Sequence, residues 1–126
     1  MAAPVSDSEL ELMKIIWGRG GEALYAEIME DLAADGRDWQ KNTVITLLSR
    51  LMEKGFLGVS KLGRRNRYTA LVTREDYQAS QTRSLLDKLY RGEARGLVMT
   101  LVREEMLTGE DYEELRAFWE EKREKL

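Results

Sequence analysis

The chain has 126 residues, of which 43% are hydrophobic and 34% charged, and its formal net charge is −3. It contains neither cysteine nor histidine. This composition excludes disulfides, thiolate metal sites and hydrolases that use a Ser-His or Cys-His pair, and we expect no metal and no cofactor. A chain of this length holds one hydrophobic core, or one core and an appendage.

The start of the sequence does not have the pattern of a secretory signal. Residues 1–8 lack the basic segment and the apolar segment of a secretory leader. No apolar run approaches the roughly 20 residues that cross a bilayer. We therefore expect a cytoplasmic protein that does not insert into a membrane.

Two amphipathic helices are predicted first. Ser6-Asp7-Ser8-Glu9 has the pattern of a capping box, and the helix that follows ends near Gly18–Gly21. A second helix is expected from about Glu22 to Ala34, before a turn at Asp35-Gly36. The inward residues expected for the two helices are Leu12, Met13, Ile16 and Trp17, then Leu24, Ile28, Met29 and Leu32.

A third helix is predicted at about residues 41–54, and it has the sharpest division between an apolar face and a polar face. Wound at 100° per residue, it places Val44, Leu47, Leu48 and Leu51 on one face. The opposite face carries Asn42, Thr43, Thr46, Ser49 and Arg50, together with Glu53. A solvated helix face usually fills with Glu and Lys, whereas short polar side chains suit close approach to the floor of a DNA groove.

A basic hairpin is predicted after this helix. Two segments with period-two alternation, residues 56–62 and 67–72, flank a turn at residues 63–66. Arg64, Arg65 and Arg67 lie at or next to the tip, where three like charges favour a nearby anion. Residues 37–74 carry a local charge of +7 and the rest of the chain −10. Screening limits the reach of the acidic part to about 10 Å.

A polar-faced helix that leads into an arginine-tipped hairpin is the layout of a winged helix-turn-helix. The predicted fold is therefore mainly α with a small β-hairpin wing. We expect residues 1–73 to form the DNA-binding domain, with the wing at residues 61–68.

The remaining residues, 74–126, are predicted to be helical. A cap at Thr73, Gly92, and a second cap at Thr108 divide them into three helices with apolar stripes. About 50 residues cannot bury these stripes alone. Either the helices fold back on the first domain, or a second copy covers them in a two-fold dimer, which we favour. The residues expected at the dimer interface are Leu85, Leu86, Leu89, Leu97, Val98, Leu101, Val102, Leu115 and Trp119.

Four stretches resemble the penicillinase repressor family (BlaI/MecI/CopY type). They are residues 6–17, residues 43–55, the wing end Arg67-Tyr68, and residues 107–111, so the resemblance runs from about Ser6 to Lys122. The family implies a homodimeric repressor that binds palindromic double-stranded DNA operators. It also implies DNA contacts from the third helix, and the matching positions are Lys41, Thr43, Thr46 and Arg50.

The resemblance carries two further implications about control. The copper-responsive branch has a C-terminal cysteine cluster, which this chain lacks, so metal sensing does not carry over. In the β-lactam branch a membrane sensor protease triggers cleavage at an Asn-Phe bond, which makes such a protease a candidate partner. The aligned bond here is Thr100–Leu101.

Two other functions compete with a repressor. A winged helix can serve as a protein-interaction module without sequence-specific DNA binding. In that case the outward face of its third helix should be apolar, whereas here it is polar. An enzyme would need carboxylate pairs such as Glu104-Glu105 or Glu110-Asp111 to be catalytic, and carboxylates at helix ends are usually caps or solvated charges. We expect no enzymatic activity.

Overall fold

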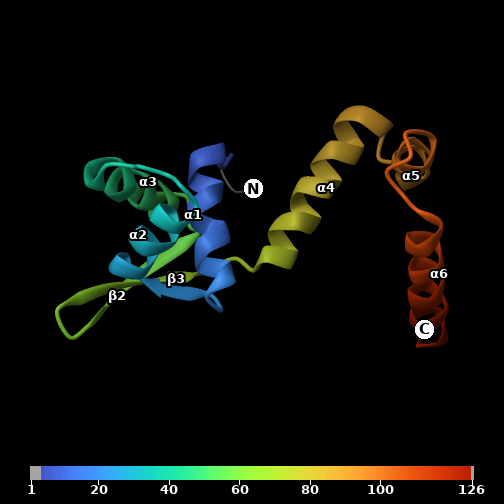
Figure 1. Ribbon diagram of the computed structural model, residues 1–126. Coiled ribbons are helices and arrows are strands. Elements are labelled where there is room, and N and C mark those ends of the chain that lie inside the picture. Colours follow the sequence, from blue (N-terminus) through green and yellow to red (C-terminus); the bar gives the residue numbers. More distant parts are fainter. Residues whose placement is uncertain (1–3, 126) are drawn as a thin grey trace. The chain divides into compact units, whose positions relative to one another are not determined.

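A computed structural model describes residues 4–125, which divide between Ala79 and Ser80 into two compact units. The first unit contains α1 (Asp7–Gly18), β1 (Glu22–Leu24), α2 (Tyr25–Ala34), α3 (Lys41–Glu53), β2 (Leu57–Leu62) and β3 (Arg65–Ala70) (Figure 1). The division falls within α4 (Arg74–Tyr90), and α5 (Ala94–Arg103) and α6 (Gly109–Glu124) belong to the second unit. The predicted fold class, mainly α with a small β-hairpin wing, is confirmed.

The core of the first unit lies between its helices and one face of its sheet (Figure 1). The apolar stripes predicted for α1 and α3 are buried, with Trp17 half-exposed at the edge of the core. The sheet contributes Ala23, Leu57 and Tyr68, whose neighbours along the strands point away from the core. The capping box at Ser6 is also confirmed, because the Ser6 hydroxyl accepts from the Glu9 amide at 3.2 Å.

The helix expected from residue 22 begins later, because its first three residues form strand β1. β1 pairs antiparallel with β3, with Ala23 opposite Tyr68, so the sheet has three strands in the order β1-β3-β2. The Ala70 amide also donates to the Gly21 carbonyl at 2.8 Å. A strand of three residues is too short to show an alternation of apolar and polar side chains. Its backbone pairs with a distant segment, so the sequence pattern did not predict it. Leu24, expected inside the helix, is instead the residue that precedes α2.

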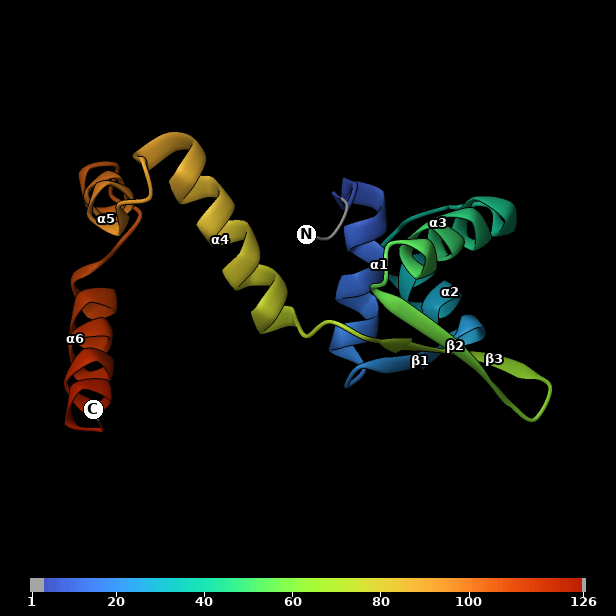
Figure 2. The ribbon, with the colours of Figure 1, turned by 180° about the vertical axis from the view of Figure 1, so that it is seen from behind.

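The hairpin departs from prediction at its tip. Its turn is the two-residue Gly63-Arg64, with Leu62 paired to Arg65, so Arg65 belongs to β3. Gly63 has φ +65, a left-handed conformation that glycine adopts without steric cost. The expected half-buried alternation is wrong for residues 59–62, which are all exposed. The hairpin projects beyond the rest of the first unit, so neither face of its tip meets a core (Figure 2).

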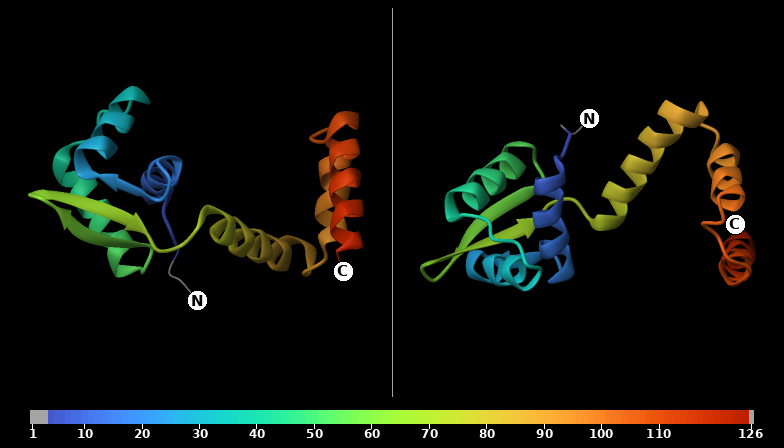
Figure 3. Two further views of the ribbon diagram at one scale, coloured as in Figure 1. Left: turned by 90° about the horizontal axis from the view of Figure 1, so that it is seen from below. Right: turned by 45° about the horizontal axis from the view of Figure 1, so that its top comes forward.

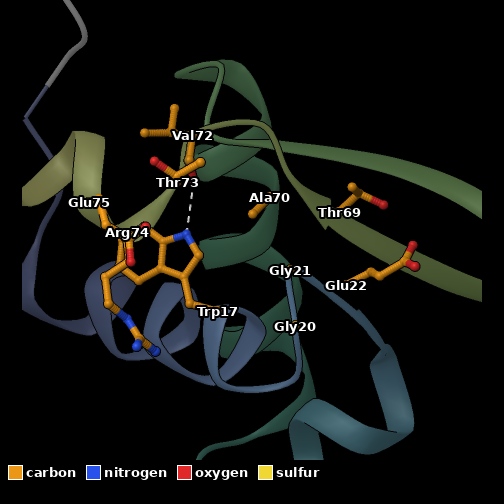
Figure 4. A pocket seen from close by; sticks show the side chains of 10 residues that line it. All are labelled: Trp17, Gly20, Gly21, Glu22, Thr69, Ala70, Val72, Thr73, Arg74 and Glu75. Atoms are coloured by element: carbon orange, nitrogen blue, oxygen red, sulfur yellow. Dashed lines mark hydrogen bonds between the residues drawn. The ribbon is translucent and has the colours of Figure 1, made fainter.

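The start of α4 packs on the winged unit. The Thr73 hydroxyl accepts from the Asp76 amide at 3.0 Å, as the predicted cap requires. The Trp17 indole nitrogen donates to the Val72 carbonyl at 2.8 Å (Figure 4). The Tyr77 ring lies 5.8 Å from Trp17 and 5.9 Å from Phe56, centroid to centroid. The chain is thereby held against α1 as it leaves the sheet.

Residues 80–125 form helices and the turns that join them (Figure 3). None of these residues has a buried side chain. The Thr108 cap is confirmed, since its hydroxyl accepts from the Asp111 amide at 3.0 Å. The residues predicted for the dimer interface are exposed or half-exposed. The most exposed of them are Leu89, Val102, Leu115 and Trp119, at 52–63%.

Candidate nucleic-acid interface

Helix α3 is held in place by four buried side chains. Val44, Leu48 and Leu51 are fully buried and Leu47 nearly so, while Ile45 lies at the edge of this stripe at 37% exposure. Burying a leucine or valine contributes about 1.5–3 kcal/mol. Gln40, which precedes the helix, makes no capping hydrogen bond through its side chain. The position of α3 therefore depends on its apolar face, and its other face is free to be polar.

The outward face of α3 brings most of the predicted contact residues together. Asn42, Thr43, Thr46 and Arg50 line one shallow surface hollow with the edge of Leu47. Lys41 is exposed at the first residue of the helix, whereas Ser49 is half-buried at the side. Amide, hydroxyl and guanidinium groups thus share one accessible surface, as readout of base edges requires.

Thr46 has a defined hydrogen-bond state in this hollow. Its hydroxyl donates to the Asn42 carbonyl at 2.8 Å, one turn earlier in α3. The hydroxyl proton is therefore already used, while the oxygen lone pairs and the methyl group stay available. Thr46 can accept from an amino group of a base, or contact a thymine methyl.

The wing carries exposed cations on both sides of its turn. Lys61, Arg64 and Arg65 are exposed, and within residues 4–125 they form no ion pair, nor do Lys41 and Arg50. Lys61 was not among the predicted contact residues, although its place next to the turn could have identified it. Arg67 differs, because its Nε lies 3.3 Å from the Ser60 hydroxyl and 3.7 Å from a Glu22 oxygen.

Two further residues of the basic segment, Lys54 and Arg37, have structural partners. Lys54 Nζ lies 2.6 Å from Oε1 of Glu9, which is 1% exposed, and donates to the Pro4 carbonyl at 2.7 Å. Arg37 pairs with Glu11 at 3.4 Å and stacks over the Trp39 ring at 5.4 Å. Trp39 packs against the core. The local charge of +7 therefore overstates the number of cations free to meet phosphate.

The Glu9 carboxylate is kept ionised by these contacts. Burial alone would raise the pKa of Glu9, but hydrogen bonds from Lys54 and Ser6 outweigh it and hold the pKa below its ordinary value. Its second oxygen, Oε2, is buried without a hydrogen-bond partner. Lys54 is thus a structural cation at the end of α3.

A second hollow of the first unit has a different character. It is lined by Trp17, Thr73 and Arg74 with acidic neighbours Glu22 and Glu75 (Figure 4). Mixed charges make this surface a poor match for a phosphate backbone. No group of three acidic residues that could hold a metal ion occurs among residues 4–125. The helices described in this range include none long and apolar enough to span a membrane.

A helix-turn-helix scaffold, a polar recognition face on α3 and a basic hairpin define the winged-helix class of nucleic-acid-binding proteins. A family model described as "Penicillinase repressor" matches residues 5–121. The chain belongs to the penicillinase repressor family. The resemblance noted in the sequence is therefore confirmed.

Relatives of known name support this assignment. The chain is 33% identical over 117 residues to the penicillinase repressor of Bacillus licheniformis, covering 93% of this chain and 90% of that protein. It is 33% identical over 112 residues to the methicillin resistance regulatory protein MecI of Staphylococcus aureus, with 89% of each chain covered. These relatives are named as repressors and regulators, not as enzymes.

Solved structures match 61% of the chain. The solution structure of the DNA-binding domain of the repressor BlaI aligns with a TM-score of 0.52 and 35% identity, covering 61% of this chain and 94% of that one. A second, of Bacillus licheniformis BlaI in monomeric form in complex with the blaP half-operator, gives 0.51 and 35%, covering 61% and 92%. The winged-helix fold is confirmed by these matches.

Proposed function

We propose that this protein is a homodimeric transcriptional repressor of a palindromic DNA operator. Helix α3 enters the major groove of each half-site through Asn42, Thr43, Thr46 and Arg50, with Lys41 at its start. The wing contacts the flanking backbone through Arg64 and Arg65, while Arg67 also braces the sheet. The chain acts without catalysis, cofactor or metal.

The observation that carries the proposal is the composition of the exposed surface of α3. Hydrogen-bonding side chains line one hollow there, and exposed cations without ion pairs lie on the helix and the wing. A protein-interaction module would place apolar side chains on this surface. The BlaI structure with a half-operator shows that a relative with the same fold binds DNA.

The second unit supports self-association. Residues 80–125 bury no side chain, yet expose Leu89, Val98, Val102 and Leu115 at 48–61%. An apolar surface of this kind on helices marks an interface. A second copy supplies the same stripes, and a two-fold pair presents two winged heads to two half-sites.

Release by proteolysis is the induction route that the family suggests, through a sensor protease as partner. The Thr100–Leu101 bond lies inside α5, with both residues half-buried. A protease needs an extended strand in its cleft, so α5 must unwind before this bond is cut. Cleavage would separate the heads from the part of the interface that follows the bond, with Leu101, Val102, Leu115 and Trp119. Two linked heads bind up to about 10²–10⁴-fold more tightly than one, and that gain would be lost.

The homodimer is tested by sedimentation at micromolar concentration. Wild-type chain should sediment as a dimer. Replacing Leu97 and Leu101 together by Asp should give monomers, because two carboxylates cannot be buried in an apolar interface without partners. The thermal transition of the winged unit should be unchanged in this variant, since its core lies in the first unit. A wild-type monomer, or a dimeric double variant, would contradict the proposed interface.

A further inference from the structure

The second unit contains a tightly built corner between α4 and α5. Arg91 and Gly92 adopt left-handed backbone conformations in succession, with φ +53 and +78. The Gly92 amide donates to the Leu86 carbonyl at 2.9 Å, and the Glu93 amide donates to the Tyr90 carbonyl at 2.9 Å. These bonds end α4 in a fixed way. A non-glycine residue such as Arg91 keeps a left-handed backbone conformation only where the surrounding structure holds it there.

Tyr90, the last residue of α4, reaches across this corner onto α5. Its hydroxyl donates to the Thr100 hydroxyl oxygen at 3.0 Å, and Thr100 donates to the Gly96 carbonyl at 3.1 Å. The ring lies directly over Gly96. A Cβ added there would stand 2.7 Å from Tyr90 Cδ1, closer than real Cβ contacts allow.

Gly96 needs an explanation because it lies within α5. Glycine within a helix is destabilising relative to alanine. The cost is offset here by the notch that glycine leaves, into which the Tyr90 ring fits. Helix α5 has ten residues and buries none of them, and an isolated helix of this length is marginal in water. Its position relative to the end of α4 therefore depends on this contact.

We propose that Tyr90, Gly96 and Thr100 form a corner lock, a set of positioning residues that shapes the surface on which a second copy of the chain docks. The stripes on each side of the corner, with Leu89 on α4 and Val98 and Val102 on α5, are exposed in the single chain. The lock fixes them in one arrangement before association, so the dimer forms without the entropic cost of ordering the corner. This inference rests on the proposed homodimer.

The test compares two glycine-to-alanine substitutions in the full chain by sedimentation over a concentration series. Gly96→Ala should weaken dimer affinity at least about tenfold, because the methyl group displaces Tyr90. Gly109→Ala is the matched control. Gly109 also lies in a helix, as the first residue of α6, and a Cβ added there meets nothing within 4 Å. It should leave dimer affinity within about twofold of wild type.

This comparison separates positioning from local stability. If α5 needed only helical propensity, Gly96→Ala would raise helix content and leave the dimer equal or tighter. The lock predicts the opposite sign. Tyr90→Phe, which removes only the hydroxyl, should weaken the dimer less than Gly96→Ala. The double variant Tyr90→Ala/Gly96→Ala should be no weaker than Tyr90→Ala alone, because the clash is gone.

The outcomes distinguish the two proposals. A dimeric wild type with an equally tight Gly96→Ala dimer would overturn the lock and leave the homodimer standing. Additive losses in the double variant would also overturn it. A monomeric wild type would overturn the homodimer and the lock together.

Discussion

At the scale of single residues, Lys54 belongs to the basic segment but has a structural role, because its ammonium group pairs with the buried Glu9 carboxylate. Forty-five positions separate the two residues, and nothing in the local pattern links them. The capping box predicted the contact of Glu9 with Ser6, because that contact is local. The role of Lys54 depends on where α3 ends against α1, which a sequence pattern does not specify.

Removing Lys54 tests this pair. Lys54→Ala leaves the buried Glu9 carboxylate without its cation, and the free energy of unfolding at pH 7 should fall by about 1.5–3 kcal/mol. Lys14→Ala breaks an exposed pair with Glu11 and is the matched control, expected to change it by no more than about 0.5 kcal/mol. Chemical denaturation measures both. Equal effects would contradict a structural role for Lys54.

The same pair predicts a pH dependence. The folded-state pKa of Glu9 is below its ordinary value of 4.5, so the contribution is present above that pH and is lost as the pH falls through the folded-state pKa. Glu9→Gln removes this titration. The stability difference between wild type and Glu9→Gln should be greatest near pH 7 and shrink below about pH 4.5. A difference that grows on acidification would contradict the assignment.

At the scale of elements, α3 could be predicted almost completely, and the sheet only in part. Four buried side chains at helical spacing specify both the helix and its buried face. Strand β1 was missed because three residues pair with β3 through backbone groups, and their side chains also suit a helix. The wing alternation failed because its tip leaves the core, so Val59 and Leu62 are exposed alike.

Substitutions in α3 and in the wing should have different effects on DNA binding. Thr46→Ala or Arg50→Ala should weaken binding to the operator more than binding to random DNA, since base-edge contacts contribute about 1–3 kcal/mol each. Arg64→Ala or Arg65→Ala should weaken both alike and reduce the salt slope by about one unit per lost contact. Titration across salt concentrations measures these effects.

Arg116→Ala, on α6, removes one positive charge from the second unit and should leave the half-operator affinity of the head unchanged. Indistinguishable effects from helix and wing variants would favour the protein-interaction alternative.

At the scale of the whole molecule, the sequence predicts a DNA-binding part and a self-association part, with candidate residues for each. What could not be predicted are contacts that join distant segments. Tyr77 packs on Trp17 and Phe56, so the start of α4 belongs with the winged unit. Tyr90 and Gly96 interlock through shape, which hydropathy does not record.

The proposed repressor pairs with a second copy of itself to read a two-fold symmetric DNA sequence. Selection from a pool of random duplexes with the full-length protein tests it most directly. The enriched sequences should contain an inverted repeat with half-site centres separated by about 10 base pairs or a multiple of that, one helical turn per step. Enrichment of a single unrepeated site, or of no sequence above the starting pool, would contradict the account.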